Sequence, residues 1–207
     1  MLDTRRKILA AALAIADERG LDAVSMRTVG RRVGLSAMAL YPHVASKEAL
    51  LDGMVDMLLA EQLPLVEKLP AHDWPARLTA IAQGLRVLAK RHPSAFSLLL
   101  ARPSVTPDAV RATDALYQVI LDAGVPDAQV AQVERLVSTF VLGFAASEVN
   151  GRFSKGTLNP RARRAQLDPA EIPSHYRLAD HLDRPVDWDA EFEADLRYLR
   201  ALLETIS

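Results

Sequence analysis

Several basic side chains lie within a short segment and have the residue types of a nucleic-acid contact. Arg27, Arg31 and Arg32 are close together in the sequence, and Lys47 follows shortly after them. Guanidinium and ammonium groups bind phosphates, and a guanidinium can also bind a guanine edge through two hydrogen bonds. These residues therefore suggest DNA binding, which needs no covalent step.

Two short helices joined by a tight turn are expected to position these side chains. Ser25 and Ser36 are typical N-terminal caps, and Gly34 can adopt the left-handed conformation that ends the first of the two helices. Apolar residues fall where they can hold the two helices together: Val29, Val33, Leu35, Leu40 and Val44. This pattern predicts a helix-turn-helix, whose second helix enters the major groove of DNA.

Further helices are expected on both sides of this unit. Thr4 is expected to cap a first helix that runs to about Arg19 and ends at Gly20 in the left-handed conformation. Ser46 is expected to cap a later helix over about 47–62. The first helix is expected to bury Ile8, Leu9, Ala12, Leu13 and Ala16. The proline clusters are interpreted as loops. Apolar periodicity predicts helices at about 75–91, 94–101, 107–123, 127–149 and 188–205. The mix of Gly, Asn, Pro and Arg over 150–174 indicates a mobile connection, and a short helix is expected near 175–183.

Composition and motifs favour a folded, non-catalytic chain. Of 207 residues, 50% are hydrophobic and 25% are charged, and the sequence has no cysteine. Disulfides, thiolate zinc sites and a cysteine nucleophile are therefore excluded. No nucleophile lies beside a base and no glycine-rich phosphate loop is present, so a helical-bundle enzyme is a remote alternative and no cofactor is expected. His175 and His181 have the wrong spacing for a metal pair on one helix, and His72 and His92 are isolated.

The charge distribution separates a basic beginning from an acidic remainder. Residues 1–50 hold eight basic and five acidic side chains, and the rest holds 17 basic and 21 acidic. Only the first part is therefore expected to meet a polyanion, and the few residues before the first helix leave no long minor-groove arm. The longest charge-free apolar stretch, 136–147, is short of the roughly 18 residues that span a bilayer, and no signal peptide opens the chain. A cytoplasmic location without a membrane partner is expected.

The segment SMRTVGRRVGLSAMALYPHVASKEALLDGM (Ser25–Met54) resembles the DNA-binding domain of TetR-family bacterial transcriptional regulators. The resemblance implies an all-α fold, with an N-terminal three-helix helix-turn-helix DNA-binding domain over 1–48. A C-terminal helical ligand-binding and dimerisation domain would occupy 49–207, with the helix at 47–62 as the link. The implied function is a dimeric repressor that a small molecule releases from a palindromic DNA operator. Two alternatives remain open from the sequence: a DNA-binding activator, and a regulator that works through protein contacts without a small-molecule inducer.

The resemblance also implies particular DNA contacts. Arg27 matches a position that reaches a base edge, whereas His43 either contacts DNA or secures the turn. Ala39 stands where many members have threonine, and Pro42 lacks the amide that would continue the helix, so the recognition helix is expected to end by Tyr41. Phosphate contacts are implied for Thr28, Tyr41 and Lys47, and exposed recognition-helix positions for Ala37 and Met38. The predicted DNA-binding set is Arg27, Thr28, Ser36, Ala37, Met38, Tyr41, His43 and Lys47.

Two more sites are expected beyond residue 62. An apolar effector pocket is expected from Trp74, Phe96, Leu99, Tyr117, Phe140 and Phe144, with Glu148, Asn150, His175 and Tyr176 as polar groups. A dimer interface is expected from Val133, Val137, Phe140, Phe192, Leu196, Leu199 and Leu203. Periodicity alone does not separate such an interface from a core within one chain. The dimer is favoured because two DNA half-sites require two recognition helices.

Overall fold

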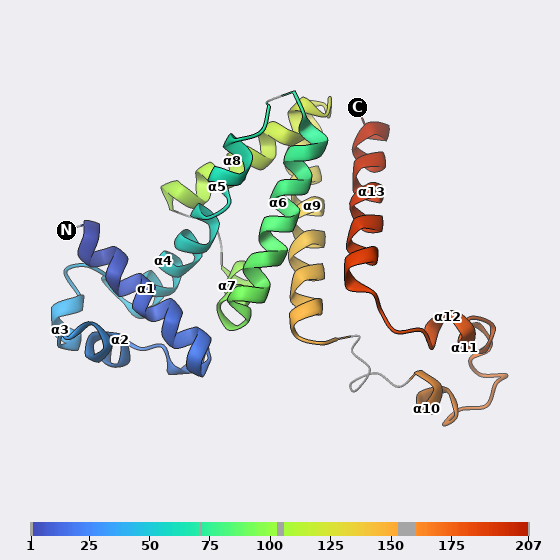
Figure 1. The fold of residues 1–207 in the computed structure, drawn as a ribbon, viewed down its shortest axis with the longest axis horizontal. Helices are drawn as coiled ribbons and strands as arrows, with labels where there is room; N and C mark the ends of the chain where they lie inside the picture. Colours follow the sequence, from blue (N-terminus) through green and yellow to red (C-terminus); the bar gives the residue numbers. More distant parts are fainter. Residues whose placement is uncertain (1, 71, 103–105, 153–159, 207) are drawn as a thin grey trace.

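The head of the molecule is formed by the N-terminal part of the chain (Figure 1). The computed structural model describes residues 2–70, 72–102, 106–152 and 160–206, and all regular elements of these residues are helical. The head comprises α1 (Leu2–Arg19), the one-turn helix η1 (Leu21–Ala23), α2 (Met26–Val33) and α3 (Ala37–Leu40). Helix α4 (Lys47–Ala60) leads from the head to the remaining helices, which we call the body.

The body is built around α6 and α9, with α13 beside them and a small lobe of short helices projecting from one end (Figure 1). Its elements are α5 (Leu63–Glu67), α6 (Trp74–Arg91), α7 (Pro93–Ala101), α8 (Pro107–Asp122), α9 (Asp127–Val149), α10 (Pro160–Arg164), α11 (Pro173–Arg177), α12 (Ala179–Leu182) and α13 (Trp188–Ile206). The structure thus confirms the all-α prediction for the described residues. None of their helices is both long and apolar enough to cross a membrane.

Serine caps fix where the short helices of the head begin. Ser25, Ser36 and Ser46 each accept a hydrogen bond from the backbone N–H three residues later, as predicted. Thr4 does not cap α1, because that helix already begins at Leu2. Gly20 has a φ of 81° but a ψ of 165°, so it adopts an extended conformation reserved for glycine instead of the expected left-handed stop.

Prolines open helices in this chain more often than they interrupt them. A first-turn proline costs no hydrogen bond, because the N–H groups there have no partner within the helix. Among the described residues, first-turn prolines occur in six helices: α5, α6, α7, α8, α10 and α11. The interpretation of every proline cluster as a loop was therefore wrong around Pro64, where α5 forms, and around Pro160, where α10 forms. Residues 153–159 of the predicted connection lie outside the described residues, and the short helix expected near 175–183 is divided into α11 and α12.

A continuous apolar core joins the head to the body. All five residues expected to face inward from α1 are buried: Ile8, Leu9, Ala12, Leu13 and Ala16. Val29 and Leu40 are fully buried where α2 and α3 meet the rest of the head. Leu35 was expected to pack there too, but 38% of it is exposed, because it follows the Gly34 turn on the outer side.

Candidate nucleic-acid interface and body cavity

The turn between α2 and α3 depends on two glycines. Gly34 is left-handed, with a φ of 74° and a ψ of 24°, and so ends α2 as predicted. Gly30 lies against the following turn, where the Leu35 N–H donates a hydrogen bond to the Gly30 carbonyl over 2.8 Å. A Cβ atom at residue 30 would lie 2.8 Å from the Leu35 carbonyl oxygen and 3.3 Å from the Ala37 nitrogen. Only glycine therefore permits this approach of the two helices.

Helix α3 presents a short, exposed surface. The Ser36 hydroxyl accepts the Ala39 N–H, and the helix ends at Leu40 with Tyr41 as its C-cap, in agreement with the expected effect of Pro42. Met38 is 75% exposed and Tyr41 45% exposed, although large apolar groups usually avoid water. These two side chains are therefore placed where they can meet a partner surface.

The arginines of α2 divide into two groups. Arg32 holds Glu18 of α1 through two hydrogen bonds of 2.6 Å, and this contact lowers the pKa of the Glu18 carboxyl. Arg32 therefore fastens α2 to α1. Arg27 and Arg31 are exposed, and no residue that the structure describes pairs with either of them. These two guanidinium groups remain available for DNA.

The other residues predicted to contact DNA lie around the same turn, and one of them already makes a side-chain hydrogen bond within the chain. Thr28 completes a capping box with Ser25, and its hydroxyl donates to the Ala23 carbonyl over 2.7 Å. A phosphate contact through that hydroxyl would therefore have to replace an internal hydrogen bond. Lys47 is exposed at the first residue of α4, where the helix dipole also favours an anion. His43 is half-buried, and its backbone N–H donates a hydrogen bond to the Leu40 carbonyl.

Replacement of Arg27 by alanine should weaken specific DNA binding by about 1–3 kcal/mol and relax the preference at one base pair. The reason is that an exposed guanidinium at this position can bind a base edge through two hydrogen bonds, which alanine cannot replace. Competition binding with single-base variants of the bound site measures both effects. An equal loss on every variant would contradict the base-edge assignment.

Replacement of Lys47 by alanine should instead weaken binding on all DNA sequences alike. The slope of log affinity against log salt should fall by about one, because one fewer counterion is released. A titration at several salt concentrations checks this result. Arg135→Ala is the control, because that exposed arginine lies on α9 in the body. An unchanged salt slope in Lys47→Ala would refute the phosphate contact.

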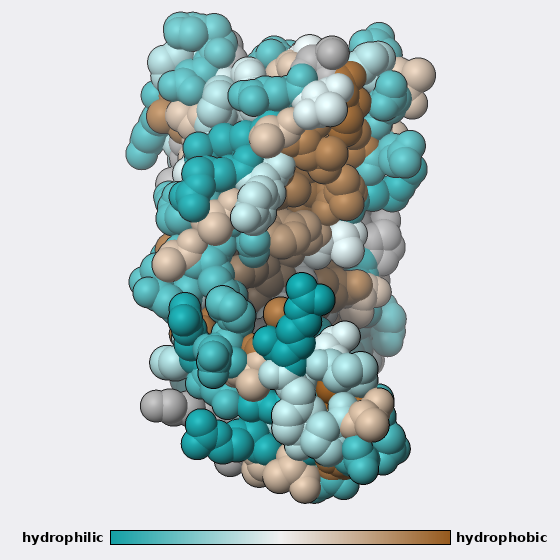
Figure 2. Space-filling view, turned by 90° about the vertical axis from the view of Figure 1, so that its right-hand side faces the viewer, coloured by the Kyte–Doolittle hydropathy of each residue, from teal (hydrophilic) through white to brown (hydrophobic). Residues whose placement is uncertain are grey.

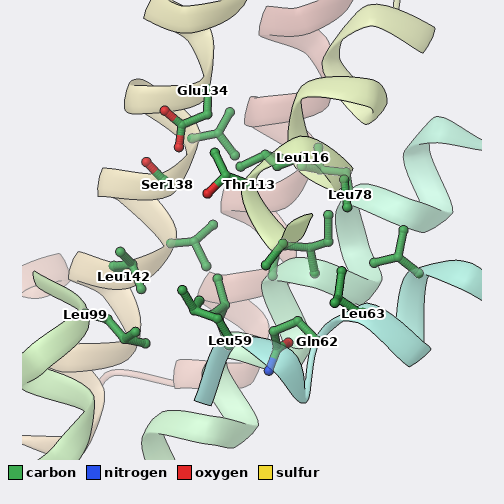
Figure 3. A pocket seen from close by; sticks show the side chains of 18 residues that line it. Leu59, Gln62, Leu63, Leu78, Leu99, Thr113, Leu116, Glu134, Ser138 and Leu142 are labelled. Atoms are coloured by element: carbon green, nitrogen blue, oxygen red, sulfur yellow. The ribbon is translucent and has the colours of Figure 1, made fainter. Parts of the chain in front are cut away.

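The body encloses an apolar cavity of about 210 Å³ between α4, α5, α6, α7, α8 and α9 (Figure 3). Aliphatic side chains form most of its wall, and Leu59 near the end of α4 is one of them. Its lining residues are Leu59, Gln62, Leu63, Val66, Leu78, Ile81, Ala82, Leu85, Leu99, Ala112, Thr113, Ala115, Leu116, Glu134, Val137, Ser138, Val141 and Leu142.

Most of the predicted effector contacts lie elsewhere. Of the ten, all within the described residues, only Leu99 lines the cavity. Phe96 is fully buried in the core, and Trp74 and Tyr117 pack against it. Phe140 and Phe144 stack in an aromatic cluster with Phe192, whereas His175 and Tyr176 lie on α11. The polar groups Glu148 and Asn150 bond to Arg86 and to the Ala146 carbonyl respectively.

The sequence does contain a sign of the cavity, but it lies in polar residues of α9 and not in the aromatic residues. Glu134 and Ser138 are one helical turn apart on α9 and share a face with the apolar residues Val137 and Val141. Polar residues within an otherwise apolar helical stripe are candidates for a buried polar function. The aromatic residues stood out instead because they are large, and large side chains usually fill the core.

The apolar stripe of α13 packs within the single chain. Phe192, Leu196 and Leu203 are fully buried, and Leu199 is 7% exposed. Val133 and Val137 are buried as well, so among the predicted interface residues only Phe140 keeps substantial exposure. The core alternative therefore accounts for the burial of the other six residues, whereas Phe140 remains accessible to a partner chain.

Polar contacts connect α4 to the helix ends of the body. Arg102, at the end of α7, donates to Asp52 over 2.7 Å, and Thr106, which caps α8, donates to Asp56. Arg91 of α6 pairs with Glu61 just after α4. In addition, His92 and Asp17 join the start of α7 to α1 over 2.7 Å. The head is thus held by the same helices that enclose the cavity.

Two family descriptions match the chain, one for each part of the molecule. "Bacterial regulatory proteins, tetR family" matches residues 8–54, and "Tetracyclin repressor-like, C-terminal domain" matches residues 66–206. An HTH-type transcriptional regulator of Saccharopolyspora erythraea is 30% identical over 201 residues, which are 96% of this chain and 83% of that protein. The HTH-type transcriptional repressor DrrR1 of Streptomyces coeruleorubidus is 31% identical over 148 residues, which are 70% of this chain and 54% of that protein.

Solved structures of bacterial proteins also resemble the whole chain. Apo ActR of Streptomyces coelicolor superposes with a TM-score of 0.82 at 25% identity, covering 98% of this chain and 95% of ActR. The same protein in complex with actinorhodin gives a TM-score of 0.79 at 25% identity, over 96% and 95% of the two chains.

Proposed function

Because this chain belongs to the TetR family of bacterial regulators, we propose that it is a dimeric transcriptional repressor that a small molecule releases from DNA. Members of this family are DNA-binding regulators and not enzymes. The observation that carries the proposal is the position of α4. One end of this helix presents Lys47 beside the helix-turn-helix, and the other places Leu59 in the cavity wall.

Two copies are needed because a recognition helix of one turn reads few base pairs. In helix-turn-helix dimers the two recognition helices enter the major groove about 34–36 Å apart. Large exposed apolar side chains on α9 and α13 support an interface there: Leu136, Tyr198 and Leu202. Figure 2 shows an apolar stripe on the side of the body that carries α13. We assign the dimer contact to this face.

An effector acts by favouring one spacing of the two heads. A ligand in the cavity touches Leu59 of α4 and Leu99 of α7, and α7 is tied to α4 through Arg102 and Asp52. A shift of these walls therefore moves the head that α4 supports. The population shifts only by the difference in ligand affinity between the two arrangements.

Repression is proposed in preference to activation because DrrR1, a relative, is named a repressor, and because ActR has been solved with a bound small molecule. The experiment uses a labelled duplex that the protein binds, titrated with a panel of metabolites while fluorescence anisotropy reports release. At least one compound should dissociate the complex without unfolding the protein. If no compound changes binding, yet a co-purified protein does, the protein-interaction alternative holds instead.

A further inference from the structure

The polar atoms of the cavity are concentrated at its two ends (Figure 3). At one end lie the Glu134 carboxylate and the Ser138 hydroxyl of α9 together with the Thr113 hydroxyl of α8. Gln62 lies at the opposite end, and the wall between is almost entirely aliphatic. A ligand that fills this space is therefore apolar along its body and polar at its ends.

Glu134 is the one charged residue among the described residues that line the cavity. It is half-buried, and no Lys, Arg or His of the described chain pairs with it. The hydroxyls of its neighbours already donate to helix carbonyls, Thr113 to Ala109 over 3.1 Å and Ser138 to Arg135 over 3.4 Å. This end of the cavity therefore offers hydrogen-bond acceptors and a negative charge.

Gln62 gives independent evidence that a ligand completes the site. It is only 6% exposed, and its Oε1 atom is buried without a hydrogen-bond partner. A buried carbonyl oxygen without a partner is unfavourable, so such atoms are rare unless something else supplies a donor. A ligand N–H or O–H in the cavity would supply it.

We infer that the effector is an amphipathic cation, with an ammonium or similar donor group against Glu134 and its apolar part between α6, α8 and α9. This inference rests on the proposed function of the cavity as the effector site. An anionic ligand would bring a second negative charge beside Glu134 and would find no basic side chain among the lining residues. A neutral donor can also form a hydrogen bond with the carboxylate, but it forgoes the attraction between opposite charges.

The test compares ligands that share one carbon skeleton and differ in the end group. Phenylbutylamine, phenylbutanol and phenylbutyrate are titrated into the full-length protein by isothermal calorimetry. The amine should bind about tenfold more tightly than the alcohol, because its ammonium adds the attraction of opposite charges to a hydrogen bond that either group can donate to the carboxylate. The carboxylate should bind more weakly than the alcohol.

Two variants distinguish the role of Glu134 from a general effect of charge. Glu134→Gln should remove the preference for the amine and leave the affinity for the alcohol within about twofold, since the amide keeps the shape of the side chain. Glu204→Gln is the control, because that residue is exposed on α13, and it should keep the preference.

The possible failures have different meanings. Carboxylate binding as tight as amine binding, or a preference for the amine that survives in Glu134→Gln, would overturn the inference while leaving the cavity as an effector site. If none of the three compounds binds, the inference and the assignment of the cavity as the effector site both fail.

Discussion

Replacement of Gly30 by alanine should reduce affinity for the specific DNA site about 10³-fold or more, to the level of non-specific binding. The added Cβ would lie 2.8 Å from the Leu35 carbonyl oxygen, and a backbone atom cannot move away as a flexible side chain can. Helix α2 must then separate from the turn, and α3 loses its orientation relative to Arg27. Competition binding on specific and random duplexes measures the loss.

Ala10→Ser is the control, because it also adds a single heavy atom to the head, at an exposed position of α1. This control should bind DNA like the unmodified protein. Circular dichroism should show that Gly30→Ala keeps its helices, because the body does not depend on that turn. Specific binding by Gly30→Ala within about twofold of the unmodified protein would show that the close approach does not set the recognition geometry.

Replacement of Arg86 by methionine should destabilise the protein by about 3–5 kcal/mol, because it leaves a buried carboxylate without its main partner. Arg86 binds Glu148 through two hydrogen bonds of 2.6 Å and Asp189 of α13 through another of 2.6 Å. It also lies 4.9 Å from the centre of the Phe192 ring, where a cation–π contact adds to the pair. The side chains of Arg86 and Glu148 are only 12% and 10% exposed. Urea unfolding measures the loss.

Lys90→Met is the control for this prediction. Lys90 binds the same carboxylate over 2.9 Å, but its side chain is 48% exposed. Its loss should therefore cost no more than about 1 kcal/mol. Equal destabilisation by the two variants would contradict the assignment of Arg86 as the main partner of the Glu148 carboxylate.

The effect of Arg86 should also depend on pH. Burial acts to raise the pKa of the Glu148 carboxyl, but the hydrogen bonds and charges of Arg86 and Lys90 outweigh burial and lower it. Because the folded pKa lies below the unfolded value of about 4.3, the stabilisation is present above that pH and is lost on further acidification. The difference in unfolding free energy between the unmodified protein and Arg86→Met should therefore shrink between about pH 7 and pH 3.

The head could be predicted from the sequence because its signals are local. The serine caps and Gly34 act on backbone groups a few residues away, so each reveals its function in the sequence itself. The role of Gly30 was not predicted, because its constraint comes from the carbonyl of Leu35 across the turn. The engagement of Arg32 with Glu18 likewise joins two helices that are distant in the sequence.

The sites of the body could not be predicted in the same way. Helix α9 is apolar on several faces, so its periodicity does not say which face meets the cavity and which meets α13. The structure places Val137 in the cavity wall and stacks Phe144 on Phe192. The partners of Glu148 and the place of Glu134 in the cavity wall depend on the packing of α6 and α8 against α9, which no local pattern encodes.

The most direct test of the account is a selection of bound sequences from a pool of random DNA duplexes. One motif with two-fold symmetry should be enriched, with half-sites about 10 base pairs apart or a multiple of that spacing. Each duplex should carry an even number of chains. The motif should lose its preference at one position per half-site in Arg27→Ala. A protein that remains monomeric and retains no duplex at low ionic strength would contradict the account.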